Sequence, residues 1–218
     1  SEMCIRDRCY KATKRIVDIA RKNKKNIHIL HVSTGQEIEF LSKNKDVASV
    51  EITPQHLTLN APDCYDNLGS YAQMNPPIRD LNHQKKLWEG INNGTADIIG
   101  SDHAPHTVEE KSADYPNSPS GMPGVQTLVP IMLNHVNNGK LTLERFVELT
   151  SYNPSELFKI KEKGRIAKVL FALRHLDRVI KNGNGSEVRI PHAKTQSEIA
   201  NKMNLTFQQI QKYENAKN

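Results

Sequence analysis

Two residues whose side chains can bind a metal or move a proton stand at the ends of apolar segments. His31 stands in HVST at the end of the apolar segment 27–32, and Asp102 stands in GSDHAPH just after the segment 96–100. A neutral imidazole and a carboxylate are ordinary zinc ligands. A carboxylate beside a metal-bound water can also take its proton and pass it to a leaving group. The two residue types together are therefore compatible with a metal site at which a proton is moved.

A purely structural role is the alternative for both residues. A single histidine at a strand end is more often hydrogen-bonded within the fold than bound to a metal. Asp102, His103 and His106 crowd one loop, which gives the two interpretations equal weight. The sequence has no HxH or HExxH pair, so spacing alone supplies too few ligands to close a metal shell.

The surrounding sequence alternates between strand and helix patterns, which predicts a parallel sheet. The expected strands cover residues 27–32, 47–52 and 96–100, and the expected helices cover 11–25, 36–42 and 81–92. Active sites of such folds lie beyond the carboxyl ends of the strands. Strand alternation would place His31 on the face of Ile27 and Ile29, and Asp102 on the face of Ile98.

In the first expected helix, apolar residues recur at helical spacing among lysines and arginines, at Ala12, Ile16, Ile19 and Ala20. A long loop over 101–124 follows the third strand, and loops of this length in compact domains are usually functional. Further helices are expected over 125–136, 143–150 and 155–158, and residues 163–168 are the candidate domain boundary.

Composition indicates a soluble globular protein. The chain has 218 residues, a net charge of +6 and three cysteines, which fits a reducing cytoplasm. No apolar run approaches the roughly 20 residues that span a bilayer, so no membrane partner is expected. Residues 168–218 hold nine Lys and Arg against four Asp and Glu, so most of the net charge lies in this tail.

Five linked motifs in residues 11–167 resemble the dihydroorotases and allantoinases of the amidohydrolase superfamily. They are HVST at 31–34, EITPQHL at 51–57, QMNPPIR at 73–79, GSDHAPH at 100–106 and SPSGMPG at 118–124. The resemblance implies an α/β fold, the C-terminal part of a TIM (β/α)₈ barrel with about three parallel strand–helix units. It also implies one or two zinc ions and the interconversion of N-carbamoyl-aspartate and dihydroorotate in pyrimidine biosynthesis.

The resemblance assigns roles to particular residues. His31 is similar to a zinc ligand of the family, and Asp102 is similar to the ligand that also serves as catalytic acid and base. Four further residues resemble groups that bind the small-molecule substrate: Asn75 and His106, and, through their backbone, Ser120 and Gly121. His56 and His103 do not fall on family ligand positions, and a structural role is the preferred interpretation of His56.

Several features of the family have no counterpart in this sequence. The HxH pair with its following arginine, the bridging lysine or aspartate, and a further histidine are absent. Three strands cannot close a barrel, so two sheet edges remain unpaired and favour self-association, with the oligomeric state open. We expect the isolated chain not to turn over dihydroorotate; zinc-dependent hydrolysis that Asp102→Ala abolishes would overturn this expectation.

The two ends of the chain differ from the amidohydrolase-like region. Residues 1–8, SEMCIRDR, resemble translated sequencing-adapter sequence, so residues 1–10 are interpreted as a non-native leader. Residues 194–218 resemble the XRE-type helix-turn-helix family, which implies a small all-α tail that contacts DNA. The candidate DNA-contacting residues are Gln196, Gln208, Gln209 and Lys212.

Three interpretations of the whole chain are therefore open. The first is a metal-dependent cyclic amidohydrolase fragment in residues 11–167, and the second is a DNA-binding regulator whose module lies in residues 168–218. The third is a chimera of two unrelated reading frames joined near residues 165–169. The first is favoured because its motifs cover most of the chain.

Overall fold

A computed structural model describes residues 2–160 of the chain, with side chains from residue 8 onward. The chain divides into two units, Ser1–Arg165 and Ile166–Asn218, and all described residues belong to the first. Within the described range, no helix combines the length and the apolar character needed to cross a membrane.

The predicted helix-turn-helix tail lies outside the described residues and stays a prediction. The same holds for its four candidate DNA-contacting residues, Gln196, Gln208, Gln209 and Lys212.

Three short strands form one parallel sheet in the order β1-β2-β3. They are β1 (Ile27–Ile29), β2 (Ala48–Ile52) and β3 (Ile98–Ile99). Ile27 pairs with Ala48, and Glu51 pairs with Ile98. The predicted parallel sheet of three strands is confirmed, but β1 and β3 end earlier than apolar content alone predicted.

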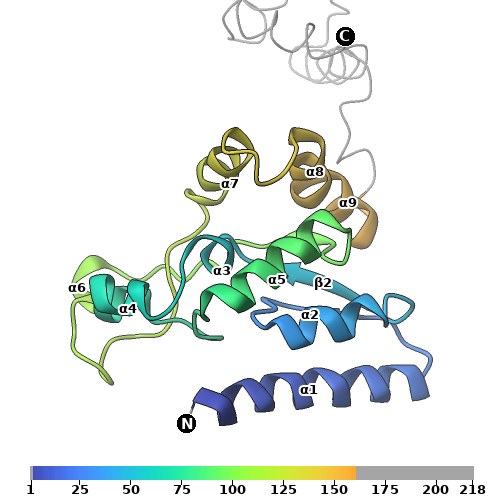
Figure 1. Ribbon diagram of the computed structural model, residues 1–218, viewed down its shortest axis with the longest axis horizontal. Coiled ribbons are helices and arrows are strands. Elements are labelled where there is room, and N and C mark those ends of the chain that lie inside the picture. The colour runs from blue at the N-terminus through green and yellow to red at the C-terminus, as the bar shows by residue number, and fades with distance from the viewer. Residues whose placement is uncertain (1, 161–218) are drawn as a thin grey trace, which may run out of the picture. The chain divides into compact units, whose positions relative to one another are not determined.

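Helices connect the strands (Figure 1). In chain order they are α1 (Glu2–Lys22), α2 (Gly35–Ser42), α3 (Pro54–Thr58), α4 (Asp63–Leu68), the 3₁₀ turn η1 (Gly69–Ala72), α5 (Leu81–Asn92), α6 (Val108–Lys111), α7 (Leu128–Asn137), α8 (Leu143–Val147), the π-helical turn η2 (Glu148–Tyr152) and α9 (Asn153–Leu157). The helices expected over 36–42 and 81–92 are confirmed within one residue at each end.

The sequence pattern predicted a helix from residue 11, but helix α1 already begins at Glu2. Residues 2–10 contain no glycine or proline that would stop a helix. Cys9 lies 3.9 Å from the Arg79 guanidinium, and the Tyr10 ring packs edge-on against Phe40 with centroids 5.8 Å apart. The end of the interpreted leader thus packs on the domain, while the resemblance to adapter sequence stays a prediction.

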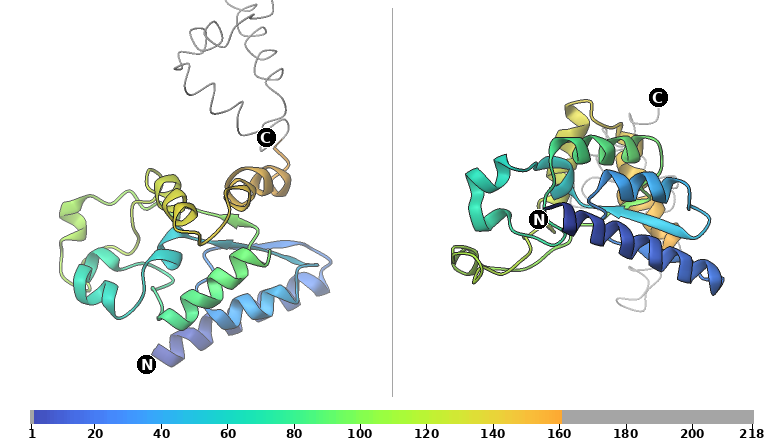
Figure 2. Two further views of the ribbon diagram at one scale, coloured as in Figure 1. Left: turned by 45° about the horizontal axis from the view of Figure 1, so that its top comes forward. Right: turned by 60° about the horizontal axis from the view of Figure 1, so that its bottom comes forward.

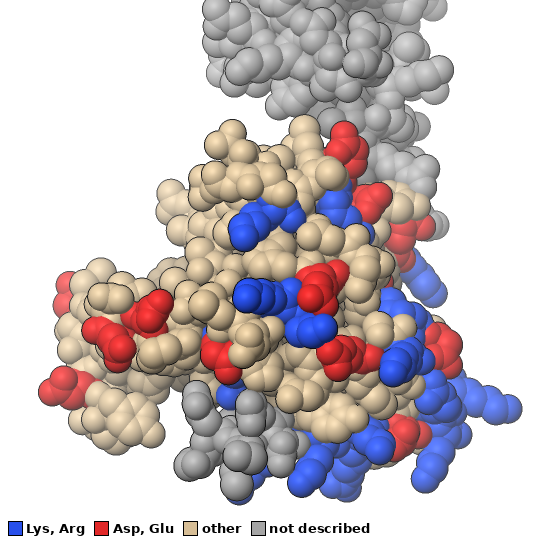
Figure 3. Space-filling view, in the orientation of Figure 1, with Lys and Arg blue, Asp and Glu red and all other residues tan. Residues whose placement is uncertain are grey.

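The buried face of α1 also differs from the expected one. Thr13, Val17 and Ala20 are buried, whereas Ile16 and Ile19 are each 43% exposed. From residue 8 onward the lysines and arginines of α1 are exposed, and basic side chains gather along the lower edge of the face seen in Figure 3. The helix is therefore amphipathic as predicted, but its apolar face is rotated from the expected one.

One face of the sheet packs on the helices and forms the main core. Val50 and Ile52 of β2 are fully buried there with Leu41 of α2 and Leu87 of α5. Helices α1, α2 and α5 lie side by side in all views of Figures 1 and 2. Burial alternates along β2, so the residues between these apolar ones face the other side of the sheet.

That other side of the sheet is polar near its centre. His28 Nδ1 lies 2.8 Å from Ser49 Oγ, and the Glu51 carboxylate follows one step along the same face. In a (β/α)₈ barrel the helices cover the outer face, and the inner face points into the barrel. The distribution of apolar and polar residues is therefore that of a barrel segment.

The long segment 101–124 runs beyond the carboxyl end of β3 and contains only the short helix α6. Backbone hydrogen bonds fold it back on itself, because the Ala104 N–H donates to Met122 O at 3.0 Å. A second bond joins it to an earlier loop, from the Gly121 N–H to Gln73 O at 3.0 Å. The segment is thereby fixed against the loop that carries Asn75.

Candidate functional site

His31 and Asp102 both adopt a left-handed backbone conformation directly beyond their strands. Their φ angles are 39° and 43°, and few residues other than glycine adopt such values without local support. Strand β1 ends at Ile29, and the positive φ angle of His31 interrupts the extended backbone beyond it. The face expected for His31 from Ile27 and Ile29 therefore could not be derived from strand periodicity.

Glu51 supports the backbone at His31. Its Oε1 atom accepts the His31 N–H at 3.2 Å, and its backbone carbonyl accepts the Val32 N–H at 2.9 Å. The same carboxylate fills the space beside Gly100, where a Cβ atom would lie 2.3 Å from Glu51 Oε2. Glu51 thus links the chain at His31 to the residue two positions before Asp102, a role that sequence reasoning missed.

His56 is enclosed by the fold and both its ring nitrogens have partners. Nδ1 lies 2.7 Å from Thr53 Oγ1, and Nε2 lies 3.0 Å from Pro76 O. The pKa of His56 is lowered to about 4, mainly by burial, which outweighs the opposing effect of the Pro76 carbonyl; the nearby His31 and Arg79 also contribute to the lowering. His56 is therefore neutral near pH 7 and holds the loop before Pro77.

The metal site implied by the sequence is not complete in this part of the chain. Among residues 2–160 no group of three or more His, Cys, Asp and Glu side chains lies together in a way that could hold a metal ion. A catalytic zinc site needs three protein ligands and one open position. His31 and Asp102 alone do not meet that requirement.

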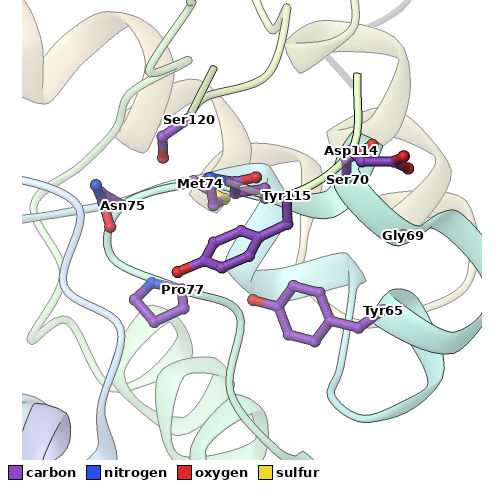
Figure 4. A pocket seen from close by; sticks show the side chains of 10 residues that line it. Tyr65, Gly69, Ser70, Met74, Asn75, Pro77, Asp114, Tyr115 and Ser120 are labelled. Carbon is purple, nitrogen blue, oxygen red and sulfur yellow. The ribbon is translucent and has the colours of Figure 1, made fainter. Parts of the chain in front are cut away.

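A pocket of about 630 Å³ lies between the two loops that carry the predicted substrate-binding residues (Figure 4). It is lined by Tyr65, Gly69, Ser70, Gln73, Met74, Asn75, Pro77, Asp114, Tyr115 and Ser120. Asn75 and Ser120 approach it from opposite loops, and the rings of Tyr65 and Tyr115 form one wall (Figure 4). Its size is ordinary for a small-molecule site. His31 and Asp102 do not line this pocket.

Two polar atoms at the pocket have no hydrogen-bond partner within the described residues. They are Ser120 Oγ and Gln73 Oε1, and both are buried. Leaving such a buried group unpaired costs about 1–3 kcal/mol, so these atoms are available to a ligand that offers hydrogen bonds. The unpaired atom of Ser120 is its hydroxyl, whereas the resemblance assigned Ser120 a contact through its backbone, so that prediction stays a prediction.

His106 and Gly121 shape the backbone around Ser120. His106 Nε2 lies 3.1 Å from Ser120 O. Gly121 has a φ angle of 114°, and a Cβ atom there would lie 2.6 Å from Ala104 Cβ. The segment can turn at this point only because residue 121 is glycine.

Gly124 makes the closest approach between the two ends of the segment 101–124. A Cβ atom there would lie 2.3 Å from the backbone oxygen of Ser101. The Gly124 N–H donates to His103 Nδ1 at 3.0 Å, which gives His103 a structural role. Gln55 Nε2 donates to the same Ser101 oxygen at 3.0 Å, so the backbone just before Asp102 is tightly enclosed.

Gly124→Ala is expected to lower the free energy of unfolding by about 2 kcal/mol, because a backbone atom must move to admit the methyl group. Urea denaturation measures the change. Ser120→Ala is the control in the same segment: it adds no atom and removes a hydroxyl that has no partner within the described residues, so stability should hold or rise. Equal stability of Gly124→Ala and the wild-type chain would contradict the close packing of Gly124 against Ser101.

Parallel strands joined by helices, with polar side chains gathered past the carboxyl ends of the strands, define an α/β protein of the barrel type. The chain belongs to the amidohydrolase family, whose model matches residues 13–168.

Relatives and solved structures agree with that assignment. The chain is 42% identical over 159 residues to the dihydroorotase of Methanosphaera stadtmanae, covering 72% of this chain and 36% of the relative. It is 38% identical over 156 residues to the dihydroorotase of Halobacterium salinarum, with the same shares covered. The structure of L-hydantoinase (dihydropyrimidinase) from Arthrobacter aurescens matches with a TM-score of 0.68 and 32% identity, covering 72% of this chain and 36% of that one. The chain thus spans about a third of the length of the relatives it matches.

Proposed function

We propose that this chain supplies the substrate-binding and proton-transferring residues of a dihydroorotase-type cyclic amidohydrolase. The observation that carries the proposal is the pocket in which Asn75 and Ser120 meet, with the Ser120 hydroxyl free of partners among the described residues. Identities of 38–42% to dihydroorotases favour dihydroorotate and N-carbamoyl-aspartate over related cyclic ureides as substrates.

The residues divide into binding and reacting groups. The Asn75 amide, the Ser120 hydroxyl and the backbone near Gly121 bind the carboxylate and amide edges of the substrate, and His106 holds the Ser120 carbonyl in place. Ring opening adds water to the ring carbonyl, breaks the C–N bond and delivers a proton to the ring nitrogen. Asp102 does not line the pocket; its role rests on the similarity of GSDHAPH to the family motif, which makes its carboxylate the group that takes a proton from the water and returns it to that nitrogen.

His31 and Asp102 are proposed as two ligands of a zinc site that requires further ligands. Bound zinc would supply electrophilic assistance at the ring carbonyl. The described residues offer no third ligand group, so we expect the purified chain alone not to hydrolyse dihydroorotate even with zinc added.

The proposal is tested in a hybrid enzyme. Residues 11–160 of this chain replace the homologous segment of the dihydroorotase of Methanosphaera stadtmanae, which provides the remaining strand–helix units. We expect the hybrid to open dihydroorotate in a zinc-dependent reaction, followed by the absorbance of the ring. The intact relative and the purified chain alone are the positive and negative controls. A folded hybrid that opens a hydantoin but not dihydroorotate would contradict the proposed substrate, and one that opens neither would contradict the proposed activity.

A further inference from the structure

Lys111 is a buried lysine at the end of α6, with only 3% of its surface exposed. Lysine is rarely buried unless its charge is compensated. Among the side chains of residues 8–160, no carboxylate forms an ion pair with it. Burial lowers the pKa of its ammonium group, because removal from water disfavours the charged form. Burying this ammonium group costs free energy, so we ask what its contacts contribute to the structure.

The contacts of Lys111 join the two loops that enclose the pocket. Its Nζ atom donates to Gln73 O at 3.1 Å and to Pro119 O at 2.9 Å. Its backbone carbonyl accepts hydrogen bonds from Ser70 Oγ at 2.8 Å and from Ser118 Oγ at 3.4 Å. Side chain and backbone of a single residue therefore fasten the turn before Asn75 to the segment before Ser120.

The bond to Gln73 is placed where it affects the pocket most directly. The Gln73 carbonyl also accepts the Gly121 N–H at 3.0 Å, so Lys111 and Gly121 share one acceptor. Asn75 follows Gln73 by two residues and Ser120 precedes Gly121 by one. Both residues face the pocket in Figure 4, and the two shared bonds fix the gap between them.

We propose that Lys111 is a positioning residue that sets the distance between Asn75 and Ser120 across the substrate pocket. The role in substrate binding rests on the proposed function. The hydrogen bonds by which Lys111 joins the Gln73 and Pro119 loops, called the Lys111 clamp below, do not depend on it. A lysine suits this role because its ammonium group donates several hydrogen bonds from a long stem. Charge-assisted bonds to two carbonyl oxygens are also stronger than neutral ones. A neutral side chain of the same length would leave both carbonyls without that donor.

The first test uses the full chain and needs no substrate. Lys111→Met keeps the length of the side chain and removes its three donors. We expect amide hydrogen exchange at Gly121 to become about tenfold faster, because the variant loses one charge-assisted hydrogen bond that holds the two loops together. Exchange in the core strand β2 should stay unchanged. Unchanged exchange at Gly121 in a folded variant would overturn the clamp.

Lys45→Met is the matched control. Lys45 also bonds a backbone carbonyl, Thr95 O at 2.9 Å, and it pairs with Asp97, but it lies at the amino ends of the strands. Its loss should not change exchange at Gly121. An equal increase in both variants would show general loosening rather than a local clamp.

A second test separates positioning from stability in the hybrid enzyme. Lys111→Met should raise KM for dihydroorotate about tenfold while kcat changes much less, because Asn75 and Ser120 bind but do not react. Combining it with Asn75→Ala should add little, because both changes act on the same contact. Fully additive effects on KM would overturn the positioning role. An inactive hybrid would count against the proposed function alone, since hydrogen exchange still decides the clamp.

The wild-type chain provides a measurement for the case in which Lys111→Met does not fold. Ammonium protons of exposed lysines exchange with water too quickly to be observed by NMR near neutral pH. Lys111 should give a protected ammonium signal with cross-peaks to Gln73 and Pro119. The absence of any protected lysine signal would overturn the inference.

Discussion

Asp102→Asn is expected to lower kcat of the hybrid enzyme by about 10²–10⁴-fold, the usual contribution of a positioned acid–base group. The amide has nearly the shape of the carboxylate but cannot accept the proton from water. Asparagine is also one of the few residues that tolerate a left-handed backbone, so it keeps the φ angle of 43° at this position. Alanine would add backbone strain to the loss of the carboxylate.

Steady-state kinetics and zinc content measured together identify the cause of the loss. Asp46→Asn is the control, because Asp46 is an exposed carboxylate that pairs with Arg21 just before the amino end of β2. It should leave kcat unchanged. Activity of Asp102→Asn within a few-fold of the hybrid would remove Asp102 from the proposed chemistry.

The fold of the central region was predictable because local signals agree there with tertiary packing. Helix α5 starts where Asp80 accepts hydrogen bonds from the backbone of Asn82 and His83, and its apolar residues Leu87 and Ile91 are fully buried. In α1 the periodicity was ambiguous. Ile16 and Ile19 are more apolar than Thr13, but the Thr13 hydroxyl donates to Glu37 at 2.8 Å, and this contact fixes which face is buried.

The ends of the strands were not predictable, because His and Asp adopt positive φ angles more often than most residues but still only rarely. His31 and Asp102 are not glycines, yet both take positive φ angles. Their conformation depends on contacts with distant residues, such as the bond from the His31 N–H to Glu51. Alternation therefore predicted β1 and β3 too long and could not give the direction of either side chain.

The candidate site was predictable only in part. The resemblance of QMNPPIR and SPSGMPG to family motifs predicted Asn75 and Ser120 as binding residues, and both line one pocket. The burial of Lys111 was not predicted, because the segment VEEKSAD around it has the composition of a solvated turn. Its burial depends on carbonyl groups at Gln73 and Pro119, and sequence patterns carry no information on where backbone carbonyls meet a side chain. A dispersed network of this kind becomes visible only in three dimensions.

The free energy of unfolding of the wild-type chain is expected to fall by up to about 3 kcal/mol between pH 6.5 and pH 4 through His56 alone. The pKa of His56 is about 4 in the folded chain, against 6.5 for an ordinary histidine. Between these values the unfolded chain binds a proton that the folded chain does not, so lowering the pH favours unfolding. The contribution is fully present above pH 6.5 and is lost as the pH falls towards 4.

The hydrogen bonds of His56 explain why the folded chain resists its protonation. The Pro76 carbonyl can only accept, so Nε2 carries the proton and Nδ1 accepts from the Thr53 hydroxyl. Protonation would reverse the bond at Nδ1 and place a second positive charge near the buried Arg79. Water does not solvate that charge, because only 2% of His56 is exposed.

Urea denaturation from pH 4 to pH 8 of the wild type and of His56→Gln isolates this contribution. Glutamine does not titrate, so the variant should be less stable at pH 7 but lose much less stability on acidification. His135→Gln is the control: His135 also has a pKa lowered by burial, but it is only partly buried, and its removal should change the pH dependence less. Parallel pH profiles of the wild type and His56→Gln would mean that another group causes the acid sensitivity, because carboxylates that titrate below pH 5 affect both chains equally.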